Sequence, residues 1–148
     1  MLDGIYLSQE KYIQDLTRVA LNDHHTVDTP MELGVHLRAT DGEPLADLTR
    51  YRHPVGSLVY LGITRPNISH LVHILSQFVA APTQLDYTHL LRLLRYLHGT
   101  ISHRHRLFFS RSSPLHLQAY SDVAWASDHF DRRSLSAYCV FLGSSLIA

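Results

Sequence analysis

The apolar residues of this chain recur first with the period of an α-helix and later with the period of a β-strand. Apolar positions that repeat three and four residues apart predict helices at residues 11–20, 51–62, 68–79 and 86–98. The stretch from residue 22 to residue 47 has no such period and contains prolines and glycines, so it predicts an extended connection over a surface.

Residues that usually begin or end helices flank these segments. Ser8 is the predicted N-cap of the first helix, and Thr64 is the predicted cap before Pro66, which suits a first helical turn. Gly99 is predicted to end the last helix at the C′ position. The side chains predicted to face the core in the last three helices are Tyr51, Val55, Leu58, Val59, Ile68, Leu71, Val72, Leu75, Phe78, Val79, Tyr87, Leu90, Leu91, Leu94 and Leu97.

Strands are predicted at residues 4–8, 104–109, 115–120 and 137–142, with a further strand beginning at residue 146. Apolar and polar residues alternate in the third of these, which predicts a half-buried strand. The fourth is apolar on both faces, which predicts a central strand with Cys139 in the core. Because the sequence reaches Ala148 within a strand, we expect an incomplete sheet. Helices followed by strands predict an α+β fold.

Charge is distributed unevenly, although it sums to zero. Residues 1–50 carry nine acids and four bases, whereas residues 51–121 carry seven arginines and one carboxylate, Asp86. This basic segment favours an anionic partner, and nucleic acid is the obvious one. Arg92 and Arg95, on the polar stripe of the last helix, can bind phosphates bidentately or form an ordinary solvated surface. The other arginines considered for the same positive surface are Arg104, Arg106, Arg111, Arg132 and Arg133.

Asp122 is the candidate metal ligand, because it is predicted where a strand ends and a polar loop begins. A carboxylate in that place is held by the sheet and faces solvent, as in Mg²⁺-dependent nucleases, although loop aspartates after strands are common. Trp125 is predicted to pack as a lid on the sheet edge. The histidine pairs 70/73 and 103/105 allow a transition-metal site, but no Glu or Cys lies at metalloenzyme spacing, which favours a histidine-rich surface.

Other classes of protein are disfavoured by what the sequence lacks. It has no Gly-rich phosphate loop, no Gly-x-Ser-x-Gly motif and no run of about 18 apolar residues that could cross a membrane. The N-terminus does not resemble a secretory signal, and a single cysteine suits a reducing compartment. We therefore expect an intracellular protein of the cytoplasm or nucleus that is neither secreted nor membrane-bound.

Short motifs with a shared resemblance occur in order along nearly the whole chain. They are GIYLSQ at 4–9, VDTPM at 27–31, VGSLVYL at 55–61, TRPNI at 64–68, SQF at 76–78, LRYLHGT at 94–100, YSD at 120–122, WA at 125–126, DRRS at 131–134 and YCVFLG at 138–143. Together they resemble the Pol polyprotein of copia-type LTR retrotransposons, from a point just after the polymerase active site of reverse transcriptase to the start of RNase H.

The resemblance implies a domain organisation and a partner. Residues 1–50 would be the end of the reverse transcriptase palm and an extended connection. Residues 51–103 would be a helical thumb-like segment, and residues 104–148 the N-terminal strands of a truncated RNase H-like domain. The parent enzyme binds an RNA/DNA template–primer, and its helices would contact the phosphate backbone without base specificity.

The resemblance also limits the activity that we expect. The Tyr-x-Asp-Asp polymerase motif of the family is absent from this sequence. Of the family's Mg²⁺-binding aspartates in RNase H only Asp122 is matched, and Ala124 stands where the second acid of Asp-x-Asp-Trp is expected. Two-metal hydrolysis needs several carboxylates, so we expect no stably bound Mg²⁺ and an inactive fragment. The alternatives are a stand-alone basic nucleic-acid-binding module without catalysis and a histidine-based metal protein.

Overall fold

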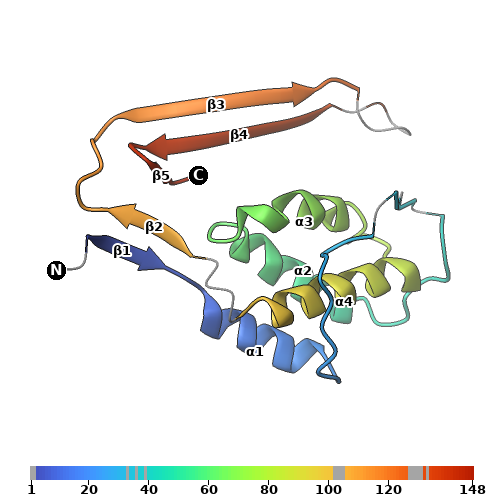
Figure 1. Cartoon of the computed structure of the whole chain (residues 1–148). Coiled ribbons are helices and arrows are strands. Elements are labelled where there is room, and N and C mark those ends of the chain that lie inside the picture. Colours follow the sequence, from blue (N-terminus) through green and yellow to red (C-terminus); the bar gives the residue numbers. More distant parts are fainter. Residues whose placement is uncertain are drawn as a thin grey trace. The chain divides into compact units, whose positions relative to one another are not determined.

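The chain has an α+β fold, as its sequence predicts. The computed structural model describes residues 3–32, 34–35, 37–38, 40–101, 106–126, 132 and 134–148. The chain divides into a helical unit, Ser8–His105, and a β unit made of Met1–Leu7 together with Arg106–Ala148 (Figure 1). The helical unit is therefore inserted, in sequence, between two parts of the β unit.

The helical unit contains α1 (Glu10–Ala20), α2 (Thr49–Leu61), the short 3₁₀ helix η1 (Pro66–Ile68), α3 (Ser69–Ser76) and α4 (Gln84–Gly99). The predicted helices are confirmed, although the third starts with the 3₁₀ turn at Pro66 and its α-helical part ends at Ser76. Each helix contributes one apolar face to a shared core. The buried side chains of this core are Ile13, Leu16, Leu45, Tyr51, Val55, Leu58, Leu61, Ile68, Leu71, Val72, Leu75, Leu90, Leu93, Leu94 and Leu97.

The observed core differs from the predicted one at several positions. Four residues predicted to face the core are only partly buried, namely Phe78, Val79, Tyr87 and Leu91. Leu61 and Leu93 are fully buried although the pattern did not select them, and Val59 is 58% exposed although it was predicted to face inward. The buried face of α2 passes through Leu58 and Leu61, which lie three residues apart. Val59 follows Leu58 directly, so it points about 100° away from that residue around the helix.

The predicted helix caps Ser8 and Thr64 are wrong. Gln9, not Ser8, precedes the first helical residue of α1, and no side chain caps that helix. The buried hydroxyl of Thr64 donates to Oε1 of Gln9, 2.6 Å away, and thereby links the loop after α2 to the start of α1. The Thr64 hydroxyl, which the local sequence pattern assigned to a helix cap, therefore forms a hydrogen bond between segments that are distant in sequence.

Both ends of α4 are defined by close contacts. At its start, Oγ1 of Thr83 accepts from the N–H of Asp86 (3.3 Å), and Oδ2 of Asp86 accepts from the N–H of Thr83 (2.8 Å), which is a capping box. At its end Gly99 is the last helical residue rather than the predicted C′ residue, and Thr100 follows as the C-cap. A Cβ at Gly99 would lie only 3.0 Å from Cβ of Thr26, so glycine allows the chain to approach α4 closely.

The described residues between α1 and α2 contain no helix and no strand, which agrees with the predicted extended connection. An isolated β-bridge joins Pro44 to Thr83, and the N–H of Leu45 donates to the carbonyl of Pro82 across 2.9 Å. Leu45 is itself buried in the core. The second half of the connection is therefore attached just before α4 begins.

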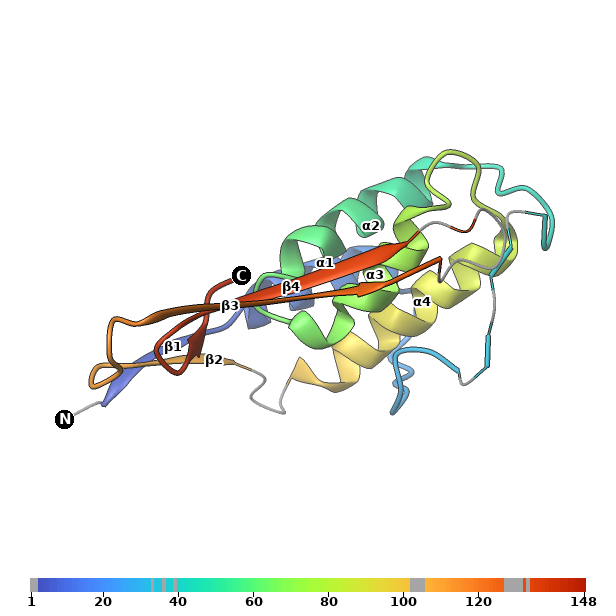
Figure 2. The same ribbon diagram turned by 90° about the horizontal axis from the view of Figure 1, so that it is seen from above.

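The β unit contains two antiparallel sheets, formed by β1 (Gly4–Leu7), β2 (Leu107–Ser110), β3 (Leu117–Ala124), β4 (Leu135–Leu142) and β5 (Ser145–Leu146). β1 pairs with β2, and the other sheet has the order β3-β4-β5, with β3 and β4 side by side along their whole length (Figure 2). The predicted central position of β4 is confirmed. Within the described residues, the strand predicted from residue 104 begins at Leu107.

The sheet of β3, β4 and β5 leaves most of its side chains in solvent. All eight residues of β3 are exposed, so the prediction of a half-buried strand is wrong. Cys139 is half-buried rather than part of a core, and Trp125 is 86% exposed rather than packed on the sheet edge. The described part of the β unit contains no helix, so within that part no helix covers the apolar side chains of these strands.

Candidate nucleic-acid interface

Arg92 projects from α4 toward the connection between α1 and α2. Its Nη1 donates to Oε1 of Glu32 across 2.9 Å, and its Nη2 donates to Oγ1 of Thr29 across 3.0 Å. Its Nε is buried and has no hydrogen-bond partner among the described residues. This guanidinium is thus held by side chains 60 and 63 residues earlier in the chain.

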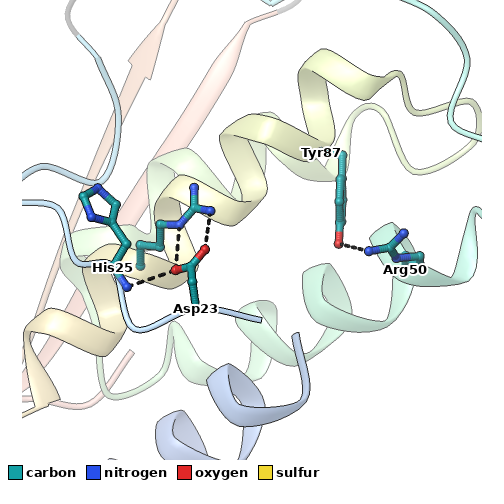
Figure 3. A network of polar contacts seen from close by, with 5 residues as sticks. Asp23, His25, Arg50 and Tyr87 are labelled. Atoms are coloured by element: carbon teal, nitrogen blue, oxygen red, sulfur yellow. Dashed lines mark hydrogen bonds and ion pairs between the residues drawn. The ribbon is translucent and has the colours of Figure 1, made fainter. Parts of the chain in front are cut away.

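Arg95 lies one turn further along α4 and makes the same kind of contact. Its Nη2 and Nε donate to the two carboxylate oxygens of Asp23, across 2.8 Å and 3.4 Å. The Asp23 carboxylate also accepts from the backbone N–H of His25 at 3.0 Å (Figure 3). The hydrogen bond from Arg95, aided by that from His25, holds the pKa of Asp23 below its usual value. Asp23 therefore stays ionised to a pH below the ordinary aspartate pKa, and the ion pair is lost as the pH falls through the lowered pKa of Asp23.

The polar stripe of α4 thus presents two guanidinium groups that already bind oxygen anions. Both arginine side chains are 26% exposed, so each remains within reach of solvent. Thr88, one turn before Arg92 on α4, donates its hydroxyl to the carbonyl of Gln84 in its own helix. Because a guanidinium binds phosphate with the same N–H groups that bind carboxylate, this surface has the chemistry for a phosphate backbone.

Arg50 lines a pocket that was not predicted from the sequence. The pocket, of about 230 Å³, lies between the end of α1, the start of α2 and α4, and its lining includes Arg50, His53 and Tyr87. Nη2 of Arg50 donates to the hydroxyl of Tyr87 across 3.1 Å, and its guanidinium carbon lies 5.1 Å from the ring centre (Figure 3). The sequence pattern does not indicate this contact, because Arg50 and Tyr87 lie 37 residues apart in the chain.

Arg65 is a cation in the interior of the helical unit, 3% exposed. Its Nε donates to Oδ1 of Asn67 (3.2 Å) and its Nη2 donates to Oγ1 of Thr100 (3.0 Å), both of which are neutral. Burial lowers the pKa of Arg65, and Tyr96 partly opposes this effect. Thr100 is the C-cap of α4, so the cation lies near the negative end of the helix dipole.

Asp122 is part of β3 and not the first residue of a loop, which corrects the predicted placement. The strand continues to Ala124, because Asp122 pairs with Ala137 and the next two residues also pair with β4. Its exposed carboxylate accepts from the N–H of Val123 at 2.9 Å. The described residues contain no group of three or more His, Cys, Asp or Glu side chains that could hold a metal ion.

The remaining predicted site residues are scattered or lie outside the described residues. Arg106 precedes β2, Arg132 is exposed with a φ of 59°, and Arg111 donates its backbone N–H to Asp3. His70 and His73 are exposed on α3. Four of the candidate site residues lie outside the described part of the chain: His103, Arg104, His105 and Arg133. No described helix has both the length and the apolar character to cross a bilayer.

Comparison with known proteins gives matches over nearly the whole chain. The sequence is 45% identical over 141 residues to a retrovirus-related Pol polyprotein from transposon RE1 of Arabidopsis thaliana, and 43% identical over 141 residues to that from transposon RE2 of the same plant. Each match covers 95% of this chain and 10% of the polyprotein. An uncharacterized mitochondrial protein of Arabidopsis thaliana is 37% identical over 98% of this chain and 60% of its own length.

The chain spans about a tenth of the length of the two polyproteins that it matches. No family model matches the sequence, and no solved structure matches it.

Proposed function

The chain belongs to the family of the retrovirus-related Pol polyproteins of copia-type transposons, and we propose that it is the part in which reverse transcriptase ends and RNase H begins. Its similarity to the polyproteins extends over 95% of its length, and the motifs that resemble reverse transcriptase precede those that resemble RNase H. The order of elements, with α1 to α4 followed by β2 to β5, is compatible with that arrangement.

In this proposal each part of the chain has a role in the parent enzyme, which carries out RNA-directed DNA synthesis and cleaves RNA in hybrids. Residues 1–50 are the end of the palm and the connection, and residues 51–103 are the thumb-like segment. Residues 104–148 are the first strands of an RNase H-like sheet, which in this chain carries exposed apolar faces. The partner of the parent enzyme is an RNA/DNA template–primer.

We propose further that the arginines contact the phosphate backbone of this nucleic acid. The observation that carries the proposal is that Arg92 and Arg95 lie one turn apart on α4 and both already bind carboxylate oxygens within 2.9 Å. The proposed contacts are made by Arg92, Arg95, Arg104, Arg106, Arg132 and Arg133. Such contacts give affinity without base specificity, so the binding should be indifferent to sequence and steeply dependent on salt.

The residues present do not fit the Mg²⁺ site of RNase H. Asp122 is the one carboxylate in this chain that matches the family's ligands, its oxygen is already engaged by the N–H of Val123, and Ala124 cannot coordinate a cation. Asp128 and Asp131 lie outside the described residues and do not align with family ligands. A single exposed carboxylate binds Mg²⁺ too weakly to hold two ions. We therefore propose that this chain alone catalyses neither polymerisation nor RNA cleavage.

The binding proposal is tested by fluorescence anisotropy with a labelled RNA–DNA hybrid over a series of salt concentrations. Replacing both Arg92 and Arg95 with alanine should weaken binding and lower the slope of log affinity against log salt by up to about two, because at most about one counterion is released per phosphate contact. The control replaces Lys11 and Arg18 of α1 with alanine, which changes the net charge equally. Equal losses in the two variants would assign the binding to net charge instead of this surface.

The alternative, a stand-alone nucleic-acid-binding module, draws on one observation. The helical unit has a hydrophobic core of its own, formed by residues of all four helices and the connection. If residues 8–105 alone bound the hybrid as tightly as the whole chain, with the same salt slope, this alternative would be favoured, because the strands would then contribute nothing to binding.

A further inference from the structure

The connection between α1 and α2 is acidic, and it crosses a basic face of α4. We call residues 22–47 the acidic strap; they carry six carboxylates and one arginine. Just before the strap, the N–H of Leu21 donates to the carbonyl of Thr17 in α1, and near its end the N–H of Leu45 donates to the carbonyl of Pro82. Between these attachments the strap passes along α4 (Figure 1).

Ion pairs join the first half of the strap to α4. Asp23 lies 2.8 Å from Arg95 and Glu32 lies 2.9 Å from Arg92, and these are both of the arginines that α4 contains. The guanidinium groups that we propose as phosphate ligands are therefore occupied by carboxylates of the same chain. A phosphate and a carboxylate cannot use the same N–H groups at once.

These ion pairs are of the kind that a competing anion can displace. The side chains of Glu32 and Asp23 are 61% and 44% exposed, so water and salt reach them. Exposed pairs of this kind contribute little to stability and are screened by salt. Arg92 also keeps an Nε–H that no described group accepts, so Glu32 and Thr29 do not exhaust its donors.

We propose that the acidic strap competes with nucleic acid for Arg92 and Arg95, so that a phosphate backbone binds α4 only where the strap releases it. This inference rests on the proposed function, because it requires these arginines to be phosphate ligands. The strap acts as an intramolecular substitute for the phosphate backbone and lowers the apparent affinity of the chain for every nucleic acid alike.

The competition has a signature in the salt dependence of binding. When a phosphate replaces a carboxylate on an arginine, the nucleic acid releases its condensed cations but the freed carboxylate attracts cations again. The net release is then smaller than the number of phosphate contacts predicts, and the salt slope is less steep than it would be without the strap carboxylates. Removing the two carboxylate charges should steepen the slope by up to about 0.9 for each phosphate contact.

The experiment compares D23N/E32Q with a matched control, D28N/D41N. Asp28 is an exposed and Asp41 a half-buried carboxylate of the same strap. Neither side chain has an ion pair among the described residues, so both variants lose the same two charges. Binding of a fluorescein-labelled RNA–DNA hybrid is measured by anisotropy against salt. We expect D23N/E32Q to bind about 2- to 30-fold more tightly with a steeper slope, and the control to change clearly less with an unaltered slope.

Three outcomes would overturn the inference. An equal gain in both variants would show an effect of net charge only. An unchanged affinity in D23N/E32Q, with weaker binding in R92A/R95A, would remove the competition and leave the proposed function standing. No binding by any variant or by the original chain would remove both. Circular dichroism checks the fold of each variant, and the single variants D23N and E32Q provide the same comparison if the double variant does not fold.

Discussion

Arg65 is a buried arginine, 3% exposed, whose guanidinium donates to two neutral oxygens. Replacing it with lysine keeps the charge but removes the planar fork that reaches Asn67 and Thr100 together. We expect the free energy of unfolding to fall by about 1–3 kcal/mol in urea denaturation. The control Arg18→Lys, at an exposed ion pair on α1, should stay within about 0.5 kcal/mol; equal losses would contradict this account.

Asp122 allows a test of catalysis at the same scale. The chain should not cleave the RNA strand of a hybrid with Mg²⁺ or with Mn²⁺, because one carboxylate cannot fix two cations. A gel assay should therefore give the same background for the chain, for its Asp122→Asn variant and for either one in a chelator. Cleavage by the chain that the variant abolishes would mean that other carboxylates complete the site.

Individual polar side chains were the hardest features to predict from the sequence. The charge pattern identified Arg92 and Arg95 as a basic stripe, but their partners Glu32 and Asp23 lie 60 and 72 residues away. Thr64 was assigned to a cap for its local position, whereas the fold gives it Gln9 as a partner 55 residues earlier. Hydrogen bonds over such separations depend on how helices pack, which a local pattern does not contain.

Among the elements, α4 gives the clearest prediction because its first turn is closed by a capping box. Thr83→Ala removes the oxygen that accepts from the N–H of Asp86, and should destabilise the chain by about 1 kcal/mol. Thr88→Ala is the matched control, because that hydroxyl bonds only to the carbonyl of its own helix, and alanine favours a helix. Thermal unfolding followed by circular dichroism measures both; a loss as large at Thr88 would contradict the role of the cap.

Elements themselves were predictable where their signal is local. The helices follow from apolar spacing, and the strand β4 follows from its apolar run, because both signals lie within a few residues. The capping box that begins α4 is also visible in the sequence as Thr-x-x-Asp at residues 83–86, where no cap was predicted. The burial of β3 was not predictable, because alternation shows which side chains could face a partner and not whether a partner is present.

For the whole molecule we expect two levels of stability. The helical unit holds the large apolar core, whereas Leu117 and Tyr138 of the β unit are 63% and 74% exposed. In hydrogen exchange the amides of α2 and α4 should therefore be protected much longer than those of β3 and β4. Replacing Leu117 and Tyr138 with lysine should reduce aggregation without moving the helical transition. Equal protection in both units would contradict this prediction.

The α+β class was predictable because the apolar residues change from helical spacing to strand spacing along the sequence. The division of the chain into two units was not predictable. The sequence pattern separates helices from strands in chain order, whereas the structure joins β1 to the strands after residue 106. Strand pairing between distant segments depends on which edges meet, and a hydrophobic pattern specifies faces rather than partners.

The pairing of β1 with β2 has a consequence for the order of folding. Gly4 lies opposite Ser110 and Leu7 opposite Leu107, so this short ladder closes a loop of about one hundred residues. Four residue pairs return little free energy for ordering so long a chain, and contacts between such distant residues form slowly. Once the intervening helices have folded, the flexible length between the two strands is much shorter. The ladder should therefore form last, and substitutions that delay the helical unit should delay it too.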